Sequence, residues 1–84
     1  MLTTVVLNID EIYVPLKLRK TFEEDKVEGL AESILEDGQQ TPVQVREDPD
    51  KNRYVLVTGL HRLEALKALG EDTIDALIVS ARQH

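Results

Sequence analysis

The chain of 84 residues contains no cysteine and no tryptophan, and only 4% of its residues are aromatic. Without cysteine it can form no disulfide, thiolate nucleophile or cysteine-ligated metal site. No apolar run approaches the roughly 20 residues that a membrane span requires. The N-terminus also lacks the basic leader and apolar segment of a signal peptide. These absences predict a cytoplasmic protein with no membrane segment.

Basic residues are also in short supply, because 10 lysines and arginines stand against 16 acids, a net charge of −6. Phosphate neutralisation dominates nucleic-acid affinity, so we expect contact with nucleic acid to be weak or supplied by a partner. The 42% hydrophobic and 31% charged content is ordinary for a folded soluble domain. The length predicts one domain, residues 1–84, with a single modest core.

Apolar periodicity and turn residues predict a small α+β domain with a mixed sheet and helices packed on it, in the order β-α-β-β-α-β. The expected strands are residues 3–9, 43–46, 54–57 and 74–79, and the expected helices are about 24–37 and 60–69. The strands at 43–46 and 54–57 are read as an antiparallel hairpin. The segment 10–22 is read as a turn followed by a loop, because Pro15 discourages helix.

The helix at 24–37 has the clearest pattern. Its apolar residues recur at helical spacing and are assigned to the core: Val27, Leu30, Ala31, Ile34 and Leu35. Thr21 and Glu24 have the spacing of a capping box. Ahead of this helix, Ile9 and Ile12 are expected to anchor the first turn to the core.

The stretch from Tyr54 to Leu66 reads as a strand, a turn at the single glycine Gly59, and the start of a helix. Unpaired amides and the positive end of the helix dipole are expected at residues 59–62, which suits an anion. His61 and Arg62 add donors there. The pattern favours a phosphate pocket. The alternative is an ordinary β-to-α turn whose Arg62 is solvated or paired with an acid.

Two other segments are candidates for the same site. Arg19 and Lys20 lie in the only concentrated positive segment of this acidic chain, and a polyanion at Arg62 requires a second source of positive charge. The polar run at residues 39–41 is either an ordinary connection or a source of hydrogen bonds to a bound base. No metal site is predicted, since the chain has only two histidines, His61 and His84.

Together these segments resemble the N-terminal domain of ParB-type partition proteins, in the ParB/sulfiredoxin superfamily, often labelled a ParB-like nuclease domain. The resemblance spans about residues 9–79. It is carried by four segments: Arg19-Lys20-Thr21-Phe22, Leu30-Ala31-Glu32-Ser33-Ile34, Thr41-Pro42-Val43-Gln44-Val45-Arg46, and Thr58-Gly59-Leu60-His61-Arg62-Leu63-Glu64-Ala65.

The resemblance implies a ParB/sulfiredoxin-like fold with a nucleotide pocket. In the partition proteins this domain binds CTP, the strand entry similar to residues 40–43 lies near the base, and the Gly-x-x-Arg corner holds the phosphates. The implied ligand here is a nucleotide with Mg²⁺ or another phosphate compound, and the implied role is in plasmid or chromosome partition or another DNA-associated process. The implied binding residues are Arg19, Lys20, Gln40, Thr41, Pro42, Thr58, Gly59, Leu60, His61 and Arg62.

The corner Gly59-Leu60-His61-Arg62 differs from both branches of the superfamily, which have Gly-Glu-Arg-Arg in partition proteins and Gly-Cys-His-Arg in sulfiredoxins. Because Leu60 occupies the cysteine position, sulfinic-acid reductase chemistry is excluded. Two alternatives to a binding domain stay open. One is a ParB-like nuclease or phosphotransferase with His61 as its general acid–base, and the other is a protein-interaction accessory with a vestigial pocket.

Overall fold

Strands and helices alternate along the chain as the periodicity predicts, with two additional short elements. A computed structural model describes residues 4–39 and 41–79. In chain order the elements are β1 (Thr4–Asn8), the 3-10 turn η1 (Ile9–Glu11), β2 (Ile12–Tyr13), α1 (Leu16–Arg19), α2 (Glu24–Asp37), β3 (Val43–Asp48), the 3-10 turn η2 (Pro49–Lys51), β4 (Arg53–Thr58), α3 (Leu60–Ala68) and β5 (Thr73–Ile78).

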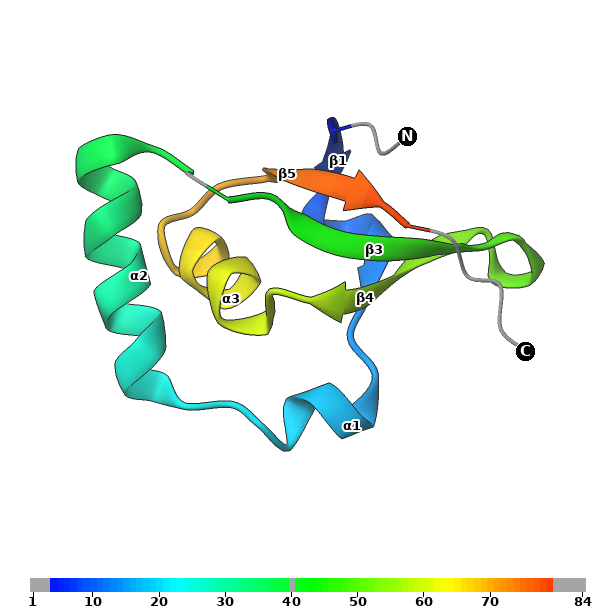
Figure 1. The fold of residues 1–84 in the computed structure, drawn as a ribbon, viewed down its shortest axis with the longest axis horizontal. Helices are drawn as coiled ribbons and strands as arrows, with labels where there is room; N and C mark the ends of the chain where they lie inside the picture. The colour runs from blue at the N-terminus through cyan, green and yellow to red at the C-terminus, as the bar shows by residue number, and fades with distance from the viewer. Residues whose placement is uncertain (1–3, 40, 80–84) are drawn as a thin grey trace.

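The described strands form one mixed sheet in the order β1-β5-β3-β4-β2. β1 with β5 and β3 with β4 are antiparallel, whereas β3 with β5 and β2 with β4 are parallel. Figure 1 shows α3 lying between the strands and α2, so α2 packs on α3 rather than on the sheet. The α+β class and the mixed sheet are confirmed, as is the antiparallel hairpin of β3 and β4.

The segment from residue 10 to residue 22 differs from its prediction as a turn and a loop. Ile12 and Tyr13 form a parallel bridge to Tyr54 and Val55 of β4. A bridge of two residues depends on β4, which is far along the chain, so no local pattern indicates it. Pro15 precedes α1 instead of preventing it.

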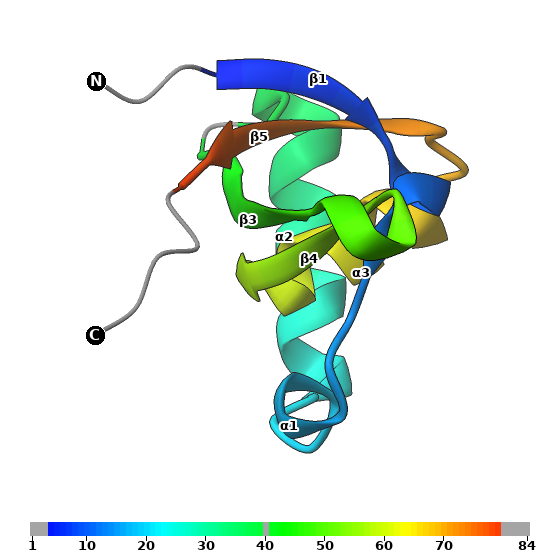
Figure 2. The same cartoon turned by 90° about the vertical axis from the view of Figure 1, so that its right-hand side faces the viewer.

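Pro15 has φ −61° and lies at the N-cap of α1, where its missing N–H has no helical partner to lose. Its carbonyl accepts hydrogen bonds from the amides of Leu18 and Arg19, at 3.0 and 3.1 Å. Figure 2 shows α1 projecting below the sheet, at the start of the connection that leads to α2. The short helix therefore places the basic residues of this segment on a defined turn.

The helix predicted at 24–37 matches α2, but two of its details are wrong. Thr21 donates its hydroxyl to the Leu18 carbonyl at 2.7 Å, and the N-cap residue Glu23 forms no side-chain cap, so there is no capping box. Leu35 is 72% exposed and lies outside the core. Of the α2 stripe, Val27 is buried and Ile34 packs against the core as a partly buried residue.

The core lies between the sheet and α3. Its largest fully buried side chains are Val43, Val45, Leu56, Leu63 and Ile74. Ile9 and Ile12 are buried in the same cluster, which confirms that they anchor the first turn. No helix in the described residues is long and apolar enough to span a membrane. Four side chains of α3 are buried, so the helix that begins after Gly59 is held against the core.

Candidate phosphate corner

The turn between β4 and α3 requires glycine for two separate reasons. Gly59 has φ +106°, a left-handed conformation that L side chains rarely adopt. A Cβ atom at this position would also lie 2.6 Å from Cγ1 and 2.9 Å from Cβ of Val43 in β3. The predicted sharp bend is therefore present, and it is pressed directly against the neighbouring strand.

The first backbone amides of α3 form no hydrogen bonds within the helix. The Leu63 amide donates to the Gly59 carbonyl at 2.9 Å, and no side chain caps the helix. The amides of residues 60–62 precede that bond, where helices leave donors without intrahelical partners. The positive end of the helix dipole adds to the attraction of an anion at this position.

Arg62 lies in the first turn of α3 and is half-buried. Within residues 4–39 and 41–79, the ion pairs are Lys26–Glu23, Arg53–Asp48 and Lys67–Glu64, and none of them uses Arg62. No hydrogen bond of its guanidinium is found in that part of the chain either. The structure therefore does not support the alternative in which a protein carboxylate pairs with Arg62.

His61 has a neighbour that the sequence pattern does not indicate. Its Nε2 accepts a hydrogen bond from the backbone N–H of Glu23 at 2.9 Å. Its ring also stacks on Phe22, with the ring centroids 5.9 Å apart and the planes at 16°. These two consecutive residues lie 38 and 39 positions before His61, so only the folded chain brings them together.

The basic segment lies beside the amino end of α3. A pocket of about 380 Å³ is lined by Val14, Arg19, Phe22, Leu60, Glu64 and Lys67. Arg19 donates from Nε to the Val14 carbonyl at 2.9 Å, and its guanidinium carbon is 5.7 Å from the centre of the Tyr13 ring. Lys20 is exposed and, in the described part of the chain, forms no ion pair. Arg19 and Leu60 therefore line one pocket, whereas Lys20, His61 and Arg62 are not among its lining residues.

The entry to β3 also reaches the corner. Gln44 is the register partner of Thr58, and a Cβ added to Gly59 would meet Val43, so the start of β3 borders the corner. Thr41 and Thr58 are both exposed and Pro42 is half-buried. Gln40, the remaining predicted contact in this segment, lies outside the described residues.

Gln39, next to it, has a structural role. Its side-chain Nε2 donates to the carbonyls of Thr41 and Asp75, at 2.9 and 3.0 Å, and its Oε1 accepts from the Asp75 amide at 2.9 Å. The side chain thus extends the backbone pairing of β5 toward the loop. Gln39 therefore holds the loop before β3 in place, and its side chain is not free to contact a ligand.

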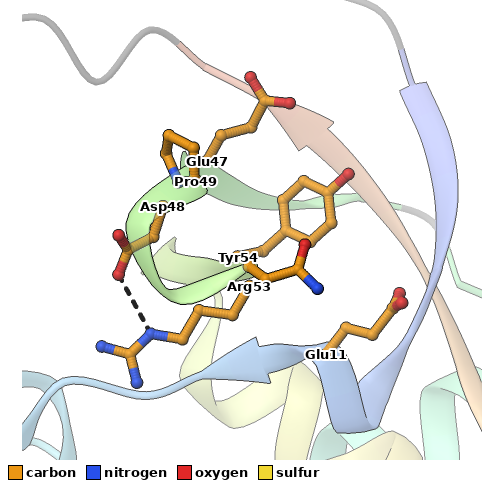
Figure 3. Close-up of a pocket in the computed structure, with 7 residues that line it drawn as sticks. Glu11, Glu47, Asp48, Pro49, Arg53 and Tyr54 are labelled. Atoms are coloured by element: carbon orange, nitrogen blue, oxygen red, sulfur yellow. Dashed lines mark hydrogen bonds and ion pairs between the residues drawn. The ribbon is translucent and has the colours of Figure 1, made fainter.

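A larger pocket, of about 530 Å³, lies at the other end of the β3–β4 hairpin, and its lining is shown in Figure 3. It is formed by Glu11, Glu47, Asp48, Pro49, Asn52, Arg53 and Tyr54. Its one cation is engaged, because Arg53 donates from Nε to Asp48 at 3.1 Å and lies 4.0 Å over the Tyr13 ring. Three carboxylates around one neutralised guanidinium would repel phosphate, so this pocket does not compete with the corner.

The described residues contain no group of three or more histidine, cysteine, aspartate or glutamate side chains that could hold a metal ion. His61 has a backbone amide as its hydrogen-bond partner, rather than a carboxylate that would orient it as a base. The arrangement provides donors and positive charge for an anion. Among the described residues, no acidic or basic side chain forms a hydrogen bond with His61.

Sequence comparison matches the family model described as the ParB N-terminal domain over residues 2–84. A probable chromosome-partitioning protein ParB from Helicobacter pylori is 42% identical over 80 residues. The match covers 94% of this chain and 27% of that protein, so the chain spans about a quarter of the length of this curated relative.

Two solved structures share the fold at a TM-score of 0.81 each. Sulfiredoxin from Arabidopsis thaliana is 33% identical, and the match covers 94% of this chain and 86% of that one. The C-terminally truncated chromosome-partitioning protein ParB from Caulobacter crescentus, complexed with CTP-gamma-S, is 29% identical, with 96% of this chain and 46% of that one covered. The expected ParB/sulfiredoxin-like fold is thereby confirmed.

Proposed function

The chain belongs to the ParB N-terminal domain family, and from that premise we propose that it binds a nucleotide or another phosphate compound at the corner formed by residues 59–62. The observation that carries the proposal is the first turn of α3, where the half-buried residue Arg62 has no ion-pair or hydrogen-bond partner in the described residues and no side chain caps the helix amides. Charge-assisted hydrogen bonds from such groups are the strongest that a small site can offer an anion.

Arg19 and Lys20 supply the remaining positive charge in this proposal. A triphosphate carries several negative charges, and Arg62 with the helix dipole neutralises only part of them. Arg19 lines the same pocket as Leu60, the first residue of α3. The chain as a whole has a net charge of −6, so the proposed site would be a basic exception in an acidic protein.

CTP is the first candidate ligand, because the partition protein of Caulobacter crescentus was solved with CTP-gamma-S. In the proposed mode, Arg62 and the amides of residues 60–62 hold the phosphates, while Thr41, Pro42 and Thr58 border the sugar or base. Mg²⁺ would accompany the phosphates rather than occupy a site of its own in the protein. Leu60 and His61 replace a glutamate and an arginine of the partition-protein motif, so the grip on a triphosphate should be weaker here.

A role in chromosome or plasmid partition, in the cytoplasm, is the biological setting that we propose. It is supported by the bacterial partition protein that the chain resembles at 42% identity. The acidic net charge makes direct, sequence-specific DNA binding by this segment alone an unfavourable alternative. Contact with DNA would therefore be weak or would come through a partner.

A thermal-shift screen tests whether the chain binds these ligands at all. A ligand that binds only the folded state at 100 times its dissociation constant stabilises that state by about 2.7 kcal/mol. We expect CTP, with or without Mg²⁺, to raise the melting temperature, and cytidine, which lacks phosphate, to have no effect. The proposal would be contradicted if neither CTP, ADP, AMP nor pyrophosphate shifted the transition at millimolar concentration.

A further inference from the structure

We infer that His61 is a positioning residue, which holds the connection between α1 and α2 against the first turn of α3. It would act on the ligand through that connection rather than by touching phosphate. The inference rests on the proposed function for its effect on affinity. The contacts of His61 in the free protein can be tested without any ligand.

The hydrogen bond with Glu23 determines which nitrogen of His61 carries the proton. A backbone N–H is a donor only, so Nε2 must offer its lone pair, and a neutral ring then carries its proton on Nδ1. An imidazolium has a proton on both nitrogens and would set one N–H against the N–H of Glu23. His61 therefore cannot hold Glu23 and donate from Nε2 to a phosphate at the same time.

His61 contacts the connection in two ways, because its ring stacks on Phe22 and its Nε2 accepts the hydrogen bond from Glu23. The ring pair and the hydrogen bond come from consecutive residues, so they fix both the position and the direction of the connection. Phe22 also lines the pocket that Arg19 shares with Leu60. Moving the connection away from α3 would open that pocket and withdraw Arg19 from Leu60.

Several charged side chains surround this contact. The connection carries Lys20 and Glu23, the start of α2 carries Glu24, Asp25 and Lys26, and α3 carries Arg62, Glu64 and Lys67. The hydrogen bond itself joins only the His61 ring and the backbone of Glu23, so none of these charged groups takes part in it.

Nuclear magnetic resonance of the free protein tests the contact directly. The nitrogen shifts of His61 at pH 7.5 should show the tautomer with its proton on Nδ1, and the Glu23 amide should exchange slowly with solvent. His61→Gln, whose side-chain oxygen can accept the same bond, should keep that amide protected, whereas His61→Leu should expose it. A proton on Nε2, or an equally protected Glu23 amide in His61→Leu, would overturn the inference.

Binding of CTP with Mg²⁺ then tests the consequence for the site. Loss of one ordinary hydrogen bond corresponds to about a fivefold change in an equilibrium, so His61→Leu should weaken binding by about that factor and His61→Gln should restore most of it.

If His61 were uncoupled from the site, His61→Leu would bind CTP as tightly as the wild type does. If the acceptor for Glu23 were unimportant, His61→Gln would bind no better than His61→Leu. Either result would overturn the inference. Complete absence of CTP binding would count against the proposed function, whereas the tautomer and exchange data would still decide the His61 contact.

Discussion

Gly59 and Val43 touch so closely that a Cβ on the glycine would lie 2.6 Å from the valine Cγ1. The contact joins the end of β4 to the beginning of β3, which are the two segments that border the proposed phosphate site. Its consequence is that the corner cannot shift without displacing the strand beside it. The geometry of the first α3 amides is therefore set by the sheet.

Replacing Gly59 with alanine should destabilise the fold more than a left-handed backbone alone would. The conformation costs about 1–2 kcal/mol for an L residue, and overpacking against Val43 adds about 1–3 kcal/mol. Urea denaturation of Gly59→Ala should show the sum of these losses in the free energy of unfolding.

Gly70→Ala is the matched control, since Gly70 has φ +81° with no atom within 4 Å of an added Cβ. It should show the conformational cost only. The Val43→Ala background should recover part of the Gly59→Ala loss, because it removes the methyl groups that clash. Equal losses at Gly59 and Gly70 would mean that the Val43 contact is not rigid.

Gln39 should affect stability and leave nucleotide affinity nearly unchanged. Its side chain forms three hydrogen bonds to backbone atoms of Thr41 and Asp75. Gln39→Ala should lower the free energy of unfolding by about 1–3 kcal/mol, since the partly buried Asp75 groups lose their partners. The exposed Glu32 of α2 provides a control, as Glu32→Ala should change stability by less than about 0.5 kcal/mol. A large loss of affinity with unchanged stability would point to a direct role for Gln39 in binding.

Arg53 and Lys26 both form ion pairs, but only the first should matter for stability. Arg53 pairs with Asp48 at 3.1 Å in a half-buried setting and lies 4.0 Å over Tyr13, whereas Lys26 and Glu23 are each 60% exposed. Arg53→Ala should cost about 1–2 kcal/mol through the pair and the cation–π contact together. Lys26→Ala should have little measurable effect.

Arg53→Lys separates the two contributions of that side chain, because it keeps the charge and loses the planar group that lies over Tyr13. We expect a partial loss of stability, measured by thermal unfolding. Complete retention would show that charge alone is important at this position. Nucleotide affinity should be unaffected in both Arg53 variants, since the pocket that contains Arg53 lies at the opposite end of the hairpin from the corner.

Local patterns were sufficient for the elements that are defined by their own residues. The stripe of α2 and the single glycine ahead of helix-forming residues place α2 and the β4–α3 turn correctly. The bridge of Ile12 and Tyr13 to β4 escapes such patterns because its partner is over 40 residues away. Leu35 has helical spacing yet is exposed, because α2 packs mainly against α3 and Leu35 lies outside that contact.

The candidate site also contains some features that local sequence predicts and others that depend on the folded chain. Gly59 and Arg62 can be recognised from a strand followed by a helix, since the chemistry of a helix amino end is local. The contacts of His61 with Phe22 and Glu23 cannot, because they depend on how the α1–α2 connection crosses α3. Gln39 appears in the sequence as one of several polar residues, and only the position of β5 gives it a structural role.

Calorimetric titration of CTP with Mg²⁺ into the wild-type chain, Arg62→Ala and Lys51→Ala tests the phosphate corner most directly. Lys51 is an exposed control for the loss of one positive charge, and it precedes β4, whose six residues span about 20 Å before the corner. Arg62→Ala should weaken binding by about 1.5–3 kcal/mol, the range for hydrogen bonds to charged groups, while Lys51→Ala should bind as the wild type does. Unchanged affinity in Arg62→Ala, or an equal loss in both variants, would contradict a phosphate site at this corner.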